Sequence, residues 1–105
     1  MDLKDFQKRL DEFLQNYETP YWTPHEILAR ITEEVGEVAR IVNSDFGPKP
    51  KKPGDEHDTL GAELADIMFA ICCMANREGI DLEDELEKAL DKAMTRDKDR
   101  FPKKK

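Results

Sequence analysis

Apolar residues recur at steps of three and four along four segments of the chain, and no segment shows the strict alternation of a half-buried strand. This periodicity predicts helices over about residues 2–17, 23–43, 59–78 and 81–95. Thr23 and Pro24 are typical of a helix start, and Gly79 is typical of a helix end. The pattern therefore predicts an all-α fold with four main helices in a bundle.

The chain has 105 residues, which suits one domain with a small core, so residues 1–105 are expected to form a single helical domain. Residues 44–58, rich in Pro, Gly and Lys, are predicted to form a loop, and residues 101–105 a flexible basic tail. The short link between the last two helices predicts an antiparallel hairpin. The third helix is apolar on more faces than three neighbours can cover, so we expect oligomerisation to complete the core.

The charge of the chain limits the kinds of molecule that it can bind. The formal net charge is −7, which argues against binding nucleic-acid polymers because phosphate neutralisation needs an excess of Lys and Arg. The charge is uneven, since residues 1–87 hold 21 acids and 9 bases whereas residues 88–105 hold 3 acids and 8 bases. The longest uncharged apolar run, residues 67–75, is too short for a membrane helix, and the first residues do not resemble a signal peptide. A cytoplasmic protein is expected, with the adjacent Cys72 and Cys73 as reduced, packed thiols.

Four carboxylates fall on or beside faces that should be buried. On a helical wheel Glu34 lies inside the apolar stripe of the second helix, and Glu37 lies at its margin. Glu63 and Asp66 share one side of the third helix, which is otherwise almost entirely apolar. Burying unpaired carboxylates costs several kcal/mol each, so these four side chains need a neutralising partner.

Three kinds of neutralisation are open from the residues alone. The carboxyl groups could be protonated through a raised pKa, they could pair with Arg30 and Arg40, or they could share a divalent cation. Two acid pairs on neighbouring helices offer oxygen ligands that suit a hard cation such as Mg²⁺ or Mn²⁺. Such a metal, with the basic end of the chain nearby, is typical of phosphoryl or pyrophosphoryl chemistry.

These motifs carry a specific resemblance. The string Glu33-Glu34-Val35-Gly36-Glu37, followed after 25 residues by Glu63-Leu64-Ala65-Asp66, resembles the EExxE…ExxD signature of the MazG-like all-α nucleoside triphosphate pyrophosphohydrolases. The likeness extends over nearly the whole chain and is greatest to small single-domain members.

The resemblance implies a Mg²⁺-dependent hydrolase that converts a nucleoside triphosphate and water to the monophosphate and pyrophosphate, with house-cleaning of non-canonical nucleotides as one role. It implies Glu34, Glu37, Glu63 and Asp66 as metal ligands, with Mn²⁺ as a substitute ion. Glu37, the less buried acid of its pair, is expected to orient or deprotonate the attacking water. Glu33 faces outward and is expected to support the site without binding the metal.

The resemblance also suggests residues that bind the substrate. Lys92 and Arg96 are expected to contact phosphates, with Lys98 and Arg100 as alternates, and Asp97 is an alternative match to the family's Asn position. Trp22 is expected either to stack on a base or to pack on the start of the second helix.

Two other functions remain open at this point. The chain could be a non-catalytic helical interaction module whose acid pairs make interchain salt bridges, or a related hydrolase of phosphoribosyl-ATP type. The expected partners are a nucleoside triphosphate and further copies of the chain, as a homodimer or homotetramer, with no membrane or nucleic-acid polymer.

Overall fold

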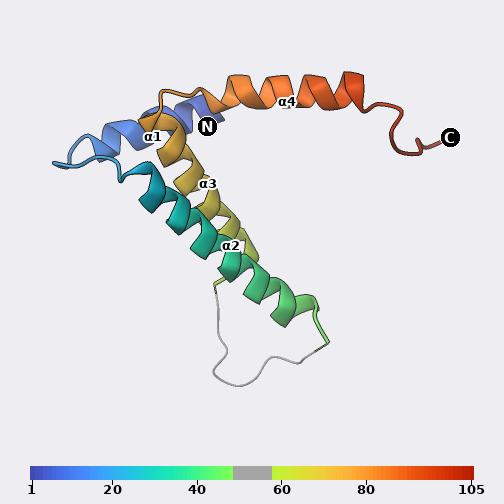
Figure 1. Cartoon of the computed structure of the whole chain (residues 1–105), viewed down its shortest axis with the longest axis horizontal. Coiled ribbons are helices and arrows are strands. Elements are labelled where there is room, and N and C mark those ends of the chain that lie inside the picture. The colour runs from blue at the N-terminus through green and yellow to red at the C-terminus, as the bar shows by residue number, and fades with distance from the viewer. Residues whose placement is uncertain (49–57) are drawn as a thin grey trace.

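The computed structural model describes residues 1–48 and 58–105 and shows four α-helices. They are α1 (Leu3–Leu14), α2 (Pro24–Phe46), α3 (Leu60–Arg77) and α4 (Leu82–Arg96) (Figure 1). No strand occurs within the two described ranges, so the predicted all-α class is confirmed. Residues 49–57 of the predicted loop lie outside the described residues.

Side-chain caps define where the helices begin. Thr23 and Glu26 form a reciprocal capping box at the start of α2. Thr59 and Asp81 accept hydrogen bonds from the first turns of α3 and α4. At the other end of α3, Gly79 has φ of 68°, and the amide of Ile80 donates to the carbonyl of Ala75 at 2.8 Å. This left-handed glycine ends α3 where the sequence predicted.

Two helix ends differ from the prediction. α1 stops at Leu14 and not at Tyr17, because the Asn16 side chain donates to the carbonyls of Glu12 and Phe13 and competes with further helix. α2 continues through residues 44–46, which were assigned to the loop, and stops only at Gly47. Pro48 follows directly, so the first residues incompatible with a helix lie later than Ser44.

The core lies mainly between α2 and α3, which run side by side (Figure 1). Ile41 of α2 and Cys72 of α3 are completely buried, which confirms Cys72 as a packed thiol. α1 packs across the end of α3, with the Phe6 ring edge-on to Phe69 at 6.3 Å between centroids. The pair α2–α3 is therefore the rigid scaffold for any site on these helices.

A buried glutamine joins α1 to the turn between α3 and α4. The side-chain amide nitrogen of Gln7 donates to Asn76 Oδ1 and to the carbonyl of Ile80, both at 2.9 Å. Its oxygen accepts from the amide of Leu82 at 3.0 Å, and the Asn76 amide donates back to the Gln7 carbonyl. This network satisfies backbone groups at the turn and determines the direction in which α4 leaves it.

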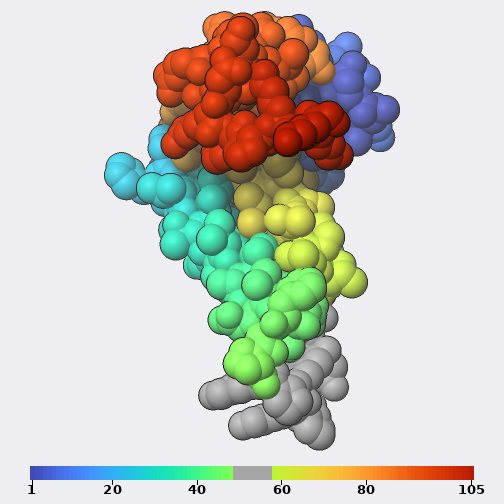
Figure 2. All heavy atoms as spheres, turned by 90° about the vertical axis from the view of Figure 1, so that its right-hand side faces the viewer, coloured from blue at the N-terminus to red at the C-terminus, as the bar shows by residue number. Residues whose placement is uncertain are grey.

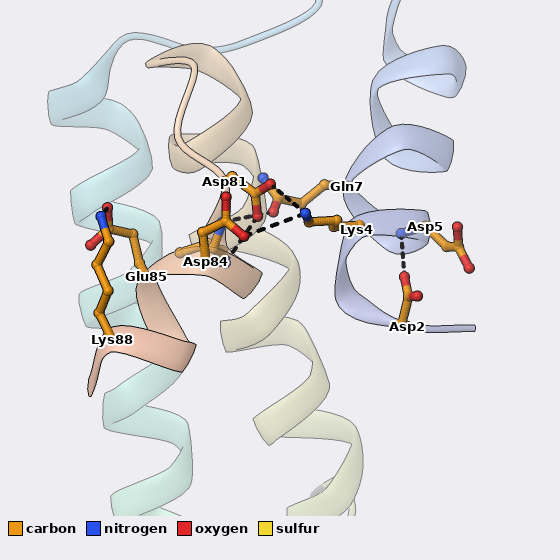
Figure 3. A network of polar contacts seen from close by, with 9 residues as sticks. Asp2, Lys4, Asp5, Gln7, Asp81, Asp84, Glu85 and Lys88 are labelled. Carbon is orange, nitrogen blue, oxygen red and sulfur yellow. Dashed lines mark hydrogen bonds and ion pairs between the residues drawn. The ribbon is translucent and has the colours of Figure 1, made fainter. Parts of the chain in front are cut away.

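A cluster of charged residues reinforces the same junction at the surface. Lys4 of α1 lies 3.3 Å from both Asp81 and Asp84 in the first turn of α4 (Figure 3). These acids also face the positive end of the α4 dipole, which favours negative charge there. The start of α4 is thus anchored to α1.

Beyond this anchor α4 leaves the rest of the chain. It extends away from α2 and α3, and in Figure 2 it forms the upper part of the molecule with the C-terminal segment. No residue of α4 is buried, and its apolar side chains Leu86, Leu90 and Met94 are exposed. The predicted antiparallel α3–α4 hairpin is therefore wrong, because the Gln7 network and the turn at Gly79 direct α4 away from α3.

The described residues contain no helix that is both long enough and apolar enough to span a bilayer.

Gln7 offers a test of the junction. We expect Gln7→Leu to lower the free energy of unfolding by about 2 kcal/mol, because part-buried groups of Asn76, Ile80 and Leu82 lose their partners. Urea denaturation measures this, with Gln15→Leu as the matched control, since Gln15 makes one exposed bond to Asp11. Equal denaturation midpoints for Gln7→Leu and the unsubstituted chain would contradict the proposed importance of the network.

Candidate active site

Three of the four predicted metal-ligating acids converge between α2 and α3. Glu34, Glu63 and Asp66 each place a carboxylate oxygen within 4.8 Å of the others. Glu34 is 6% exposed and Glu63 is 5% exposed, as the helical wheel predicted, whereas Asp66 lies at the surface. Glu63 and Asp66 lie within one turn of α3, so the α2–α3 packing alone brings the group together.

Of these three acids, Glu63 has the surroundings least favourable to a negative charge. Its Oε2 is buried and has no hydrogen-bond partner. A hydrogen bond with Glu34, burial, and the nearby negative charges of Glu34, Asp66 and Asp58 raise the pKa of Glu63 to about 7. The neighbouring negative charges that raise this pKa are also those that a bound cation would neutralise.

Glu34 also has a basic neighbour. Arg30 Nη2 lies 3.1 Å from Glu34 Oε1, one turn earlier on α2. Two of the neutralising arrangements suggested by the sequence, a raised pKa and an arginine pair, therefore occur together. They do not exclude the third, because the unpartnered Glu63 oxygen and the all-oxygen donor set fit a hard divalent cation.

Glu37 and Glu33 lie outside this group. The Glu37 side chain is 47% exposed and its carboxylate is 3.7 Å from Arg40. Glu37 is half exposed, which fits its predicted place at the margin of the apolar stripe, whereas the expectation of a buried face is wrong for Asp66, since the single chain leaves that side of α3 uncovered. Glu33 points outward, as predicted, with its carboxylate 3.9 Å from Arg30.

An apolar cavity of about 440 Å³ adjoins the carboxylates. Asp66 and Arg30 form its polar side. The other walls come from the segment before α2, the start of α2 and the middle of α3: Pro20, Tyr21, Trp22, Ile27, Phe69, Ala70 and Cys73. A mostly apolar cavity with a few convergent charges is typical of a small-molecule site.

The segment that carries Trp22 is fastened at two points. The Tyr21 hydroxyl donates to Asp11 of α1, and burial together with this bond raises the pKa of Tyr21 to about 12. Arg77 Nε donates to the carbonyl of Trp22 at 3.1 Å. The cavity wall is therefore held in place although this stretch between α1 and α2 is not helical.

The predicted phosphate-binding residues lie elsewhere. Lys92, Arg96 and Asp97 belong to α4 and its C-terminal end, and this helix extends away from α2 and α3 (Figure 1). Arg96 Nε lies 3.7 Å from Asp97. Within one chain, the structure does not bring these residues to the carboxylate group.

Several site residues were missed by the sequence analysis. Phe69 and Cys73 line the cavity and follow Asp66 by three and seven residues, so the helical wheel of α3 already placed them on its face. Arg30 was considered only as a counter-ion. The contact between Arg77 and Trp22 joins residues 55 positions apart, the contact between Asp11 and Tyr21 joins residues 10 positions apart, and no local pattern signals either of them.

Comparison with known proteins identifies the family. The model of the MazG nucleotide pyrophosphohydrolase domain matches residues 22–101. YpjD of Bacillus subtilis (strain 168) is 38% identical over 102 residues, covering 97% of this chain and 92% of YpjD.

Solved structures agree with this result. A crystal structure of B. subtilis YpjD superposes with a TM-score of 0.77 and 35% identity, covering 88% of this chain and 94% of that one. The Bacillus-conserved MazG protein, described as a nucleotide pyrophosphohydrolase, has a TM-score of 0.77 and 38% identity over 94% of this chain and 96% of its own.

The chain belongs to the MazG nucleotide pyrophosphohydrolase family, and it is a hydrolase of that family. The predicted family and enzyme class are confirmed, and the alternative of a non-catalytic interaction module is set aside.

The Glu63 environment predicts how stability depends on pH without metal. A folded-state pKa of about 7 against an ordinary 4.5 means that the folded chain binds more protons between these values. We therefore expect this contribution to stability to be complete below pH 4.5 and lost as pH rises through 7. Thermal unfolding in EDTA from pH 5 to 8 measures it.

Glu63→Gln is the informative variant for this measurement. It keeps the shape and removes the ionisable group, so its melting temperature should fall less steeply over the same range. Glu12→Gln, on the exposed side of α1, is the matched control. Parallel pH profiles for Glu63→Gln and the unsubstituted chain would show that Glu63 does not carry the effect.

Proposed function

We propose that this chain is a Mg²⁺-dependent nucleoside triphosphate pyrophosphohydrolase that converts a ribo- or deoxyribonucleoside triphosphate and water to the monophosphate and pyrophosphate. The observation that carries the metal-dependent part is the buried, unpartnered Oε2 of Glu63 beside Glu34 and Asp66. Without a bound cation, this buried oxygen only lowers the stability of the folded chain, whereas a cation would give it a partner.

Oxygen ligands from Glu34, Glu63 and Asp66 suit Mg²⁺, with Mn²⁺ as a substitute, and Glu37 would complete the set by turning toward them. Mg²⁺ keeps several waters and binds through a few carboxylates plus substrate phosphates, which fits an open site at the surface. When bound, the ion would neutralise phosphate charge and favour ionisation of water.

Glu37 is our candidate for the proton acceptor. It follows Glu34 by three residues on α2, and its carboxylate is exposed enough to reach solvent and substrate. Its carboxylate lies 3.7 Å from Arg40, which holds it on the solvent side of α2 beside the acid group. Glu33 would support Arg30 at the edge of the site.

The cavity beside Asp66 is our candidate for the nucleoside end. Trp22 and Phe69 offer faces for a base, and the carboxylates at the polar side would lie toward the phosphates. House-cleaning of non-canonical nucleotides agrees with a cavity that has few polar groups to read one base. We place this activity in the cytoplasm, where nucleoside triphosphates are used.

Phosphate contacts from Lys92 and Arg96, with Asp97 nearby, would come from a second copy of the chain. The radius of gyration is 17.7 Å, against about 13 Å for a compact chain of this length. The exposed area of 8473 Å² exceeds the roughly 6100 Å² of a compact monomer by more than a standard interface needs from one partner. We propose a homodimer or homotetramer in which α4 covers the apolar faces of α2 and α3.

The direct experiment is a panel of canonical, deoxy and oxidised nucleoside triphosphates with Mg²⁺, assayed for the monophosphate and pyrophosphate. We expect equal amounts of the two products, no activity in EDTA, and recovery with Mg²⁺ or Mn²⁺. Release of inorganic phosphate and a diphosphate would contradict the proposed reaction, and activity in EDTA would contradict the metal requirement.

Glu37→Gln tests the assigned base. We expect a loss of turnover of at least about 100-fold, because removing a general base typically costs this much, with little change in melting temperature. Glu12→Gln, an exposed acid of α1, is the control for the lost charge. Unchanged turnover in Glu37→Gln would remove Glu37 from the mechanism.

The assembly is tested by light scattering at micromolar concentration. We expect the mass of a dimer or tetramer, and a shift toward monomer in a Leu86→Glu, Leu90→Glu double variant, because charge on the apolar stripe of α4 prevents its burial. Lys88→Glu on the same helix is the control. A monomeric unsubstituted chain would contradict the proposal.

A further inference from the structure

Arg30 lies at the junction of the two halves of the proposed site. Its guanidinium contacts Glu34 at 3.1 Å, and its side chain also lines the cavity that Trp22 and Asp66 border. Among the described residues that line this cavity, it is the one with a basic side chain. No other side chain of the described site contacts the carboxylate group and carries positive charge into the cavity.

The pairing with Glu34 is electrostatically useful only while no cation is bound. The Glu34 side chain is 8% exposed, so its charge needs a counter-ion, and Arg30 supplies one. A divalent cation held by Glu34, Glu63 and Asp66 would neutralise the same carboxylate. Arg30 would then lie beside a like charge, which weakens its attraction to Glu34.

Arg30 is able to move when that happens. Its side chain is 51% exposed, so it is not locked by packing, and an arginine on α2 can rotate about several bonds toward the cavity. A nucleotide running from the cavity to the carboxylates would pass this guanidinium. Phosphate oxygens are well matched by the planar guanidinium fork, which donates two parallel hydrogen bonds.

We propose that Arg30 is an exchangeable counter-ion, which neutralises Glu34 in the metal-free enzyme and contacts the phosphates of the nucleotide once a divalent cation neutralises Glu34. This inference rests on the proposed function, since it requires a nucleoside triphosphate and a cation at this site. It assigns to Arg30 opposite effects on two ligands, because the arginine competes with the metal and assists the nucleotide.

A purely structural ion pair predicts a different result. If Arg30 only held Glu34 in position, its loss would weaken metal binding, and nucleotide binding would weaken in parallel. If Arg30 only stabilised the metal-free chain, nucleotide binding at saturating metal would not change.

The experiment compares Arg30→Gln and Arg30→Lys with the unsubstituted chain. It measures the melting temperature in EDTA, the affinity for Mn²⁺ alone by calorimetry, and the affinity for an α,β-methylene nucleoside triphosphate at saturating Mg²⁺. Arg9→Gln, on the exposed side of α1, controls for the loss of one positive charge.

For Arg30→Gln we expect a lower melting temperature in EDTA, equal or tighter Mn²⁺ binding, and analogue binding weaker by about tenfold, the effect of losing a charged bidentate contact. Arg30→Lys keeps a positive charge beside Glu34 and therefore the metal-free stability. It lacks the fork, so we expect it to bind the analogue several-fold more weakly than the unsubstituted chain. Arg9→Gln should match the unsubstituted chain throughout.

Analogue affinity within twofold of the unsubstituted chain in both Arg30 variants would overturn the inference, as would weaker Mn²⁺ binding in Arg30→Gln. Should Arg30→Gln fail to fold, Arg30→Lys decides alone, and analogue affinity equal to that of the unsubstituted chain in this variant overturns the inference. An unsubstituted chain that does not bind the analogue at all would instead contradict the proposed function.

Discussion

Two carboxylates share the interior between α2 and α3, and the rest of the site depends on how their charge is neutralised. Glu34 and Glu63 are each almost completely buried, in a chain whose core is otherwise made of a few apolar side chains. The pKa of Glu63 is raised to about 7, which favours its neutral form, and Arg30 lies 3.1 Å from Glu34 as a counter-ion. Both neutralising groups can be exchanged, because a proton leaves with rising pH and Arg30 is half exposed. These features support our proposal that a divalent cation can take the place of both.

The position of α4 follows from a second constraint, the polar junction at its start. Gln7 and Lys4 fix the first turn of α4 against α1, and nothing in the described chain covers its later turns. The apolar stripe of α4 and the uncovered faces of α2 and α3 are then exposed in the same molecule. A chain of 105 residues has too little core to leave so much apolar surface in water, so the same geometry that weakens the monomer favours assembly.

The sequence predicted the parts of the structure that local rules determine. Periodicity and caps located all four helices, and the wheel of the second helix identified Glu34 as buried, because both depend only on neighbouring residues along a helix. The direction of α4 was not predictable in this way, since it depends on Gln7, about 75 residues from the amide it binds. The cavity was missed for the same reason, because its walls come from separate parts of the chain. The exposed position of Asp66 was not predicted, since the prediction assumed that the apolar faces of α3 are covered.

Burying Glu34 and Glu63 costs folding free energy, so the stability of the fold does not account for these two acids. Replacing Glu34 and Glu63 by apolar residues of similar size would remove two desolvated charges, and such replacements are often neutral or stabilising. The helix pair itself does not need the acids, because Ile41, Cys72 and the neighbouring apolar residues already hold α2 against α3. Without Glu34, Arg30 would also lose the carboxylate that lies 3.1 Å from its guanidinium. The acids and their counter-ion therefore form one unit that the packing of the helix pair does not require, and it lies on α2 and α3, between which most of the core is found.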